Sequence, residues 1–111
     1  MAVTRYHNIT GSTGVTVELI APGSRINNLK SIMLTNVHAS SDATVTLFIQ
    51  DNPVSTAAKT FNIIHTIAIP ADSSLLLDNE SVISFDNSSS TSFGLYITVG
   101  SSDTVDVLLG L

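Results

Sequence analysis

Apolar and polar residues alternate along most of this chain with the period of two that is typical of half-buried β-strands. The clearest case is the segment 43–50, in which one face is aliphatic and three of the four residues on the other face are polar, Phe48 being the exception. The segment 30–38 before it is also apolar, and the polar residues 39–42 separate the two. This pattern predicts a β-hairpin over residues 30–51.

Turn residues recur roughly every ten residues, which is the spacing of a sandwich or barrel, and helix signals are nearly absent. Pro22 and Gly23 fit the central positions of a type II turn, and a short helical turn is expected around residues 57–58. The predicted strands are 3–10, 15–20, 26–37, 43–50, 61–69, 75–77, 82–85, 93–99 and 105–109. We therefore expect an all-β fold, an antiparallel β-sandwich or jelly-roll-like domain of about eight strands over residues 1–111.

Several predicted strands are apolar on both faces, namely 32–34, 63–69 and 75–77. A two-layer sandwich buries only one face of each sheet, so the second faces need cover from a loop or from a partner subunit. The apolar segment 107–111 raises the same question. Its packing against the chain's own core is one interpretation, and an intersubunit contact is the other. The serine-rich segment 86–92 is expected to be a flexible turn.

Charge and composition exclude several classes of function. The chain has four basic and nine acidic residues, a net charge of −5 and no cysteine. Because the four basic residues are scattered, we expect no nucleic-acid partner, and neither disulfides nor thiolate metal sites are available. The first residues lack the apolar run of a signal peptide, and the longest apolar runs are too short to cross a bilayer. We expect a soluble protein made in a cytoplasm, with no membrane partner.

Serine, threonine and asparagine together make up a third of the sequence, whereas charged residues make up 12%, about half the usual share. Short neutral side chains lose little conformational entropy when another protein covers them. This composition suits a surface that packs against a partner. The alternative interpretation is that strands are simply rich in threonine and serine.

Candidate catalytic and metal-binding residues are isolated from one another. His7, His38 and His65 form no pair with ligand spacing, and no Gly-x-Ser-x-Gly motif is present. The acidic segment 78–80 could lend oxygens to calcium but lacks the spacing of a calcium loop. We therefore predict no catalytic residue, no cofactor and no metal site, and a protein that is not an enzyme.

Glycan-related features carry little weight. Sequons at Asn8, Asn79 and Asn87 are expected by chance in a chain of this composition. The chain has six aromatic residues and no tryptophan, which weakens the case for stacking platforms for sugars or bases.

Four segments occur in an order that resembles a known family. Isoleucine-x-leucine-threonine-asparagine at 32–36 is followed, after a polar break, by threonine-valine-threonine-leucine at 44–47. A strand at 17–22 precedes them, and an Ile-Pro-Ala-Asp-Ser-Ser-Leu-Leu-Leu segment at 69–77 follows. From about residue 15 onward the chain resembles the small β-sandwich structural proteins of tailed-bacteriophage virions. It departs from the family's pattern at Asp72, where a glycine is usual.

The resemblance implies a non-enzymatic virion protein assembled in the bacterial cytoplasm, within that class a capsid decoration (cement) protein that binds and stabilises the head shell. Implied partners are the major capsid protein or other virion proteins and further copies of the chain, with a trimer favoured. Residues 1–10 would form either an edge strand of the domain or an arm that reaches a neighbour and adds a strand to its sheet. The expected partner contacts are Val3, Arg5, Tyr6, Phe48, Leu109 and Leu111.

Two other functions stay open. The protein could act as an adaptor or fibre-attachment component at the neck or tail of the virion. It could also be a carbohydrate-binding surface module, which would need aromatic and carboxylate groups converging in one loop cluster.

Overall fold

The computed structural model describes residues 4–10, 16–26, 29–51, 59–100 and 103–111, which form eight strands and one short helix. The helix is α1 (Glu80–Ile83). The strands are β1 (Thr4–Thr10), β2 (Thr16–Ile20), β3 (Ser31–Asn36), β4 (Ala43–Asp51), β5 (Thr60–Ile69), β6 (Ser74–Leu77), β7 (Phe93–Val99) and β8 (Thr104–Gly110).

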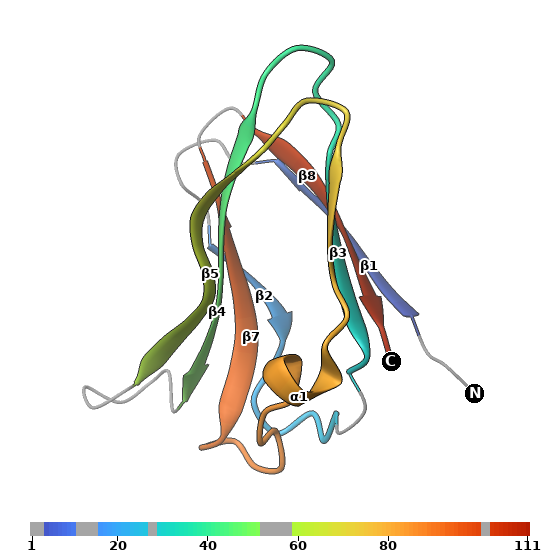
Figure 1. Cartoon of the computed structure of the whole chain (residues 1–111). Helices are drawn as coiled ribbons and strands as arrows, with labels where there is room; N and C mark the ends of the chain where they lie inside the picture. Colours follow the sequence, from blue (N-terminus) through green and yellow to red (C-terminus); the bar gives the residue numbers. More distant parts are fainter. Residues whose placement is uncertain (1–3, 11–15, 27–28, 52–58, 101–102) are drawn as a thin grey trace.

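The strands form two four-stranded antiparallel sheets that face each other (Figure 1). The first sheet has the order β1-β8-β3-β6 and the second the order β2-β7-β4-β5. Only β4 and β5 are neighbours both in sequence and in a sheet, and every other connection between consecutive strands crosses from one sheet to the other. This arrangement is the eight-stranded jelly roll. The predicted fold class, an all-β antiparallel sandwich, is confirmed.

The predicted hairpin over residues 30–51 is wrong. β3 pairs with β6 and β8 in the first sheet, whereas β4 pairs with β5 and β7 in the second. Both strands have one aliphatic face, and these faces meet across the core instead of lying side by side. A few residues suffice to connect two sheets that pack about 10 Å apart, so the same sequence pattern suits a sheet-to-sheet connection as well as a hairpin.

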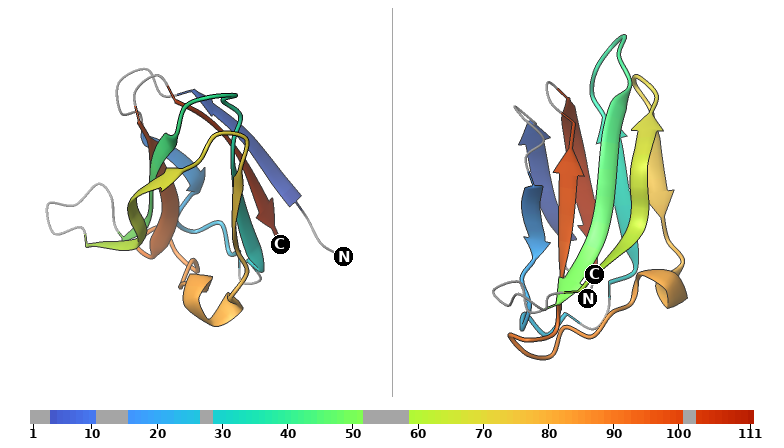
Figure 2. Two further views of the ribbon diagram at one scale, coloured as in Figure 1. Left: turned by 45° about the horizontal axis from the view of Figure 1, so that its top comes forward. Right: turned by 90° about the vertical axis from the view of Figure 1, so that its left-hand side faces the viewer.

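The two sheets pack face to face (Figure 2). The core lies between them and consists mainly of aliphatic side chains from their inner faces. Strands β3, β4 and β8 alternate strictly between buried inner residues and half-exposed outer residues over most of their length. The fully buried aliphatic residues are Ile20, Ile32, Leu34, Ala43, Val45, Leu47, Leu95, Ile97, Val99, Val105, Val107 and Leu109.

The segment predicted as a strand at 82–85 is instead helix α1 and the residues after it. The Asn79 side chain caps the helix by accepting a hydrogen bond from the Ser81 N–H at 3.2 Å. Ile83 is buried against the core and Val82 points outward. Strand β3 begins at Ser31, five residues after the predicted start at residue 26. The helical turn expected at 57–58 lies outside the described residues.

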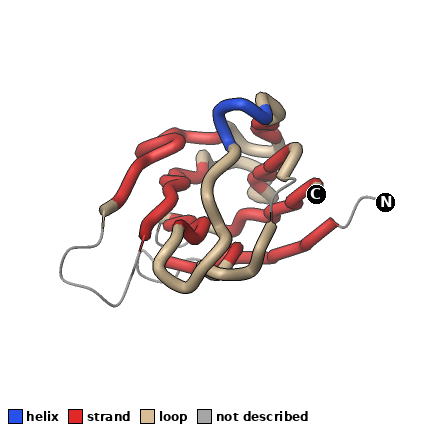
Figure 3. The backbone as a smooth tube through the Cα atoms, turned by 90° about the horizontal axis from the view of Figure 1, so that it is seen from below, coloured by secondary structure: helices blue, strands red, loops and turns tan. Residues whose placement is uncertain are grey.

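Asn87 connects the loops at one end of the sandwich, which Figure 3 shows from below. Its side-chain NH₂ donates to the carbonyls of Ala21 and Phe93 at 2.9 and 2.7 Å, and its Oδ1 accepts from the Ile26 N–H at 3.0 Å. The predicted type II turn is present in the same region, since the Ser24 N–H bonds the Ala21 carbonyl and Gly23 has a φ of 81°. Because the Asn87 side chain is buried, it is not accessible as a glycosylation acceptor.

The serine-rich segment 86–92 was expected to be a flexible turn, but hydrogen bonds hold it. Asp86 Oδ1 accepts from the N–H and the hydroxyl of Ser88 at 3.1 and 2.7 Å. These bonds, and a weaker one from Ser92, lower the pKa of the Asp86 carboxyl. The Phe93 N–H closes the loop by donating to the Asp86 carbonyl at 2.9 Å.

Candidate functional site

The outer face of the first sheet carries four bulky apolar side chains in a line that crosses all four strands. Tyr6 on β1 is opposite Leu108 on β8, Leu108 is opposite Met33 on β3, and Met33 is opposite Leu76 on β6. We call these four residues the apolar row. The two end residues are prominently exposed, Tyr6 by 73% and Leu76 by 53%. An isolated chain therefore presents a continuous apolar strip to water.

A polar row runs beside the apolar row, one pleat further along the strands: Asn8, Asp106, Thr35 and Ser74. These residues are paired with one another, since the Asn8 amide donates to the Asp106 carboxylate and the hydroxyls of Thr35 and Ser74 lie 2.8 Å apart. A shallow hollow of 480 Å³ lies between the two rows over β1, β8 and β3. The face is thus grooved, with little free charge.

The outer face of the second sheet is different, because its aromatic residues cover each other. Phe48 on β4 stacks on Tyr96 on β7 with ring centroids 5.5 Å apart. Burial of the Tyr96 phenol, together with the nearby Glu18 carboxylate, raises its pKa. Phe48 is half-buried in this stack, so it offers a partner less apolar surface than the apolar row does.

The other expected partner contacts lie in different places. Tyr6 is in the apolar row. Val3 lies outside the described residues. Arg5 is half-buried on the inner side of β1, opposite Leu109. Leu109 and Leu111 are buried in the chain's own core. The apolar segment 107–111 therefore packs within its own copy, which is the first of the two interpretations given above.

Residues 4–10 do not form an arm that leaves the domain. They are β1, an edge strand that pairs with β8 along its whole length from Thr4 to Thr10. Removal of this strand would expose the edge of β8 and part of the core, so a deletion of residues 1–10 would test folding before it tested partner binding.

His7 lies on the inner side of β1, opposite Val107. Its Nε2 is buried without a hydrogen-bond partner among the described residues, and burial, with a smaller contribution from the Arg5 charge, lowers the pKa of the imidazole. In the unfolded chain the His7 imidazole takes up a proton near pH 6.5, whereas in the native chain it is protonated only at a lower pH.

We therefore expect the free energy of unfolding to fall as the pH decreases from about 7.5 to 5.5. Urea unfolding across this range measures the slope, and the His7→Leu variant should have a shallower one. Equal slopes in the two proteins would contradict this origin of the pH dependence.

A second apolar surface lies beside α1, at the side of the sandwich where the two sheets end in β5 and β6. A groove of 220 Å³ is lined by Ile63, Leu76, Leu77, Asp78, Asn79, Val82 and Ile83, and we call it the α1 groove. Val82 at its rim is 63% exposed. The acidic segment 78–80, considered above for calcium, is used here for helix capping by Asn79.

Strand β5 next to this groove is the free edge of the second sheet. Its pairing with β4 shifts between Ile64 and Ile67, where Thr66 has a φ of 53° and its N–H donates to the Thr46 hydroxyl at 2.9 Å. This bulge interrupts the edge, which is one way in which proteins limit unwanted strand pairing. A second shift lies between Asn62 and Ile64, so residues 60–62 form the regularly paired part of the edge.

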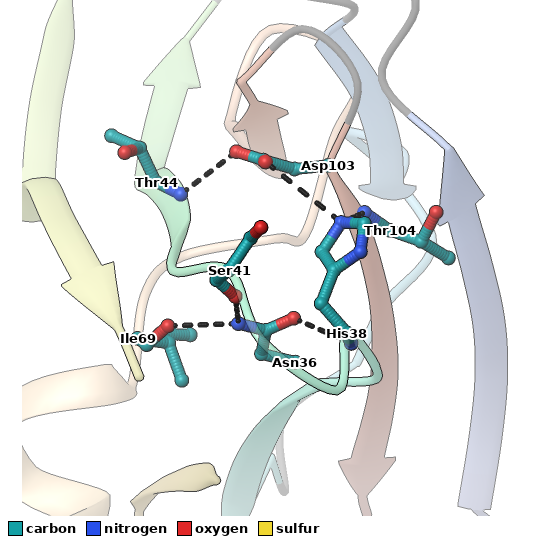
Figure 4. A network of polar contacts seen from close by, with 7 residues as sticks. All are labelled: Asn36, His38, Ser41, Thr44, Ile69, Asp103 and Thr104. Atoms are coloured by element: carbon teal, nitrogen blue, oxygen red, sulfur yellow. Dashed lines mark hydrogen bonds and ion pairs between the residues drawn. The ribbon is translucent and has the colours of Figure 1, made fainter. Parts of the chain in front are cut away.

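His38 and Asp103 form the one close histidine–carboxylate contact found within the described residues, with His38 Nε2 3.9 Å from Asp103 Oδ1 (Figure 4). The lone pair of Nε2 accepts a hydrogen bond from the Thr104 N–H at 3.2 Å, and Asp103 Oδ2 accepts from the Thr44 N–H at 3.0 Å. Both side chains therefore satisfy backbone groups at the end of the sandwich, and the nitrogen that a general base would use is occupied.

Asn36, next to this pair, completes the network. It is fully buried, and its NH₂ donates to the carbonyls of Ser41 and Ile69 at 2.8 and 2.9 Å while its Oδ1 accepts from the His38 N–H at 2.9 Å. His65, the third histidine, is exposed on β5. The described part of the chain contains no cluster of three metal-ligating side chains and no helix long and apolar enough to span a membrane.

Most residues of the two apolar surfaces were not among the expected contacts. Met33, Leu76 and Leu108 join Tyr6 in the apolar row, and Val82 lies on α1. A signal for two of them was present in the sequence, because segments 32–34 and 75–77 are apolar on both faces. The alternating period assigns such residues to opposite faces but does not say which face is buried.

No protein-family model and no curated protein matches this chain. Among solved structures it is similar to PirA, with a TM-score of 0.55 and 13% identity over 96% of this chain and 93% of that one. It is also similar to a chain of the T13 viral particle of infectious bursal disease virus, with a TM-score of 0.53 and 11% identity. The match covers 99% of this chain but 31% of the viral one. The chain thus has a fold that also occurs as part of a protein in a virus particle.

Proposed function

We propose that this protein is a non-enzymatic structural component of a virion, and specifically a capsid decoration protein that binds the assembled head shell of a tailed bacteriophage and stabilises it. The observation that carries the proposal is the apolar surface that a single copy leaves uncovered on the outside of a jelly roll. Apolar strips of this kind mark protein–protein contacts. The fold shared with a viral-particle chain and the resemblance to phage structural proteins support the same function.

We assign the shell contact to the α1 groove and the adjoining free edge of β5. An extended segment of the shell protein can pair with residues 60–62 through main-chain hydrogen bonds, and an apolar side chain of that segment can enter the groove beside Val82. Each contact is small, so attachment at many equivalent sites on the shell supplies stability that a single contact lacks.

Purification of full particles from infected cells tests the proposal. We expect the protein to remain with the particles through a density gradient, at a ratio to the major capsid protein near one to one. A handful of copies per particle would assign it to the neck or tail instead. Absence from particles would overturn a virion role, and binding to a glycan array would then favour the carbohydrate module.

The Val82→Asp variant should bind bare capsids about tenfold to a hundredfold more weakly than the natural protein. Burial of a valine side chain contributes about 1.5–3 kcal/mol, and each 1.4 kcal/mol corresponds to a factor of ten. Co-sedimentation with capsids over a range of concentrations measures the affinity.

Val37→Asp is the matched control, because Val37 is 45% exposed and follows β3 at the opposite end of the sandwich from α1. The control should bind capsids as the natural protein does. Equal binding by all three proteins would contradict the assignment of the shell contact to the α1 groove.

A further inference from the structure

We propose that the apolar row is the contact surface of a two-fold symmetric dimer, in which the first sheets of two copies pack face to face. The apolar row shares only Leu76 with the lining of the α1 groove, and the inference does not rest on a virion role. Its occupant is a second copy of this chain.

Charge favours this face as the place where two copies meet. Each copy carries a net charge of −5, so two copies repel each other unless they approach through a surface with few carboxylates. Among the outward-facing residues of the first sheet that the structure describes, Asp106 alone is charged, and the Asn8 amide already bonds its carboxylate. Covering this face therefore desolvates one partnered charge per copy.

The strand register makes the face complementary to itself. A two-fold axis parallel to the strands, between β8 and β3, reverses the order of the four strands in the second copy. Leu108 then lies opposite Met33 of the second copy, and Tyr6 lies opposite its Leu76. Apolar side chains thus meet apolar side chains along the whole row, as an isologous interface requires.

The same two-fold axis also brings the polar rows of the two copies together, and it keeps their Asp106 carboxylates apart. Asp106 lies opposite Thr35 of the second copy, because β8 and β3 exchange places. The threonine hydroxyl can donate a hydrogen bond to the carboxylate, and the two Asp106 side chains are not directly opposed. The alternative axis, parallel to the row, would place Tyr6 on Tyr6 and would leave Asp106 opposite Gly110 of the second copy.

The area of the face sets the expected strength. Strands β1 and β8 have seven residues, β3 has six and β6 has four, so with a strand spacing of about 4.8 Å the face measures at most roughly 19 Å by 23 Å. This is smaller than the ~800 Å² per partner of a standard interface. We therefore expect a reversible dimer with a dissociation constant in the micromolar range. The fraction of dimer should rise as the protein is concentrated.

Sedimentation equilibrium of the full chain at increasing concentration is the first test. The average mass should rise from 11.7 kDa toward twice that value. A protein that stays monomeric at millimolar concentration, or one that assembles directly into the trimer expected from the family resemblance, would overturn the proposal.

Two charge variants test the geometry. Met33→Asp and Leu108→Lys each change one outward-facing, half-exposed side chain, and circular dichroism should show folding like that of the natural protein. Each variant alone should dimerise at least tenfold more weakly, because an isologous interface receives the new charge twice. When the two variants are mixed in equal amounts, the introduced carboxylate meets the introduced ammonium, and the mixture should regain a dimer.

No dimer in the mixture would overturn the two-fold arrangement. Val82→Asp and Val37→Asp are the controls, since neither residue lies in the apolar row, and both should dimerise normally.

The dimer proposal and the virion proposal can fail independently of each other. A monomer that still binds capsids overturns the dimer alone, whereas a dimer that is absent from particles overturns the virion role alone. If Met33→Asp abolished capsid binding by a monomeric protein, the shell and not a second copy would cover this face.

Discussion

Truncation of Leu109 to alanine is expected to lower the free energy of unfolding by about 2–5 kcal/mol, which is the range for large-to-small substitutions in a well-packed core. Leu109 is fully buried on the inner face of β8, between Arg5 on β1 and Ile32 on β3. Its loss leaves a cavity between the two sheets. Since a domain of this size has a free energy of unfolding of about 5–15 kcal/mol, the substitution should remove a substantial fraction of it. Urea unfolding followed by circular dichroism measures the change.

Leu108→Ala is the control for this variant, because Leu108 is the neighbouring leucine in sequence and points to the opposite face. We expect it to change the stability of the monomer by less than about 1 kcal/mol, since the side chain is half-exposed, and to weaken self-association instead. Leu109→Ala should leave the dissociation constant of the folded dimer unchanged. The reverse pattern, with Leu108 important for stability and Leu109 for association, would contradict the assignment of the two faces of β8.

The strands that alternate strictly could be predicted from the sequence. In 43–50 the aliphatic residues are two apart, and only an extended chain places them on one face. The turn at Pro22 and Gly23 was also predictable, because glycine at the second central position allows the positive φ of 81° that the structure has there. These features depend on interactions between residues close in sequence.

Features that depend on distant residues could not be predicted in the same way. The choice between a hairpin and a sheet-to-sheet connection for β3 and β4 depends on strands that come later in the chain, because β6 and β8 pair with both edges of β3, and β5 and β7 pair with both edges of β4. Helix α1 was missed because the run Val82-Ile-Ser-Phe85 is short and rich in β-branched and aromatic residues, as strands are. The capping signal of Asn79 two residues before Ser81 is local and could have been recognised.

The uncovered apolar surfaces were predicted in kind but not in place. Excess apolar residues in 32–34 and 75–77 correctly indicated side chains without cover inside one copy. In 107–109, however, one valine and two leucines follow each other, so the sequence does not say which of Leu108 and Leu109 faces inward. Pairing with β1 and β3 decides the matter, because it places Leu109 beside Ile32 and Leu108 beside Met33.

Substitution of Asn36, like that of Leu109, is expected to lower the free energy of unfolding strongly. Asn36→Ala removes the donors for the carbonyls of Ser41 and Ile69 and the acceptor for the His38 N–H, in a position with no exposure to water. Each buried group left without a partner costs about 1–3 kcal/mol. We expect the free energy of unfolding to fall by about 3 kcal/mol or more, as measured by urea unfolding. Asn62→Ala on the exposed part of β5 is the control and should change it by less than about 0.5 kcal/mol.

The Asn36→Asp variant separates the hydrogen bonds from the packing, because it keeps the shape of the side chain. An ionised carboxylate cannot donate to two carbonyls and is buried beside them, so the folded state holds the introduced carboxyl protonated and its pKa lies above the ordinary value of about 3.9. The folded state then binds more protons than the unfolded state, and stability must fall as the pH rises through 3.9. We therefore expect Asn36→Asp to be more destabilising at pH 7 than at pH 4, where the protonated acid still donates one hydrogen bond. Asn36→Ala carries no such group, and the loss it causes relative to the natural protein should be nearly equal at both pH values. A loss equal at both pH values for Asn36→Asp would mean that water reaches the side chain, and it would contradict the fully buried network at this end of the jelly roll.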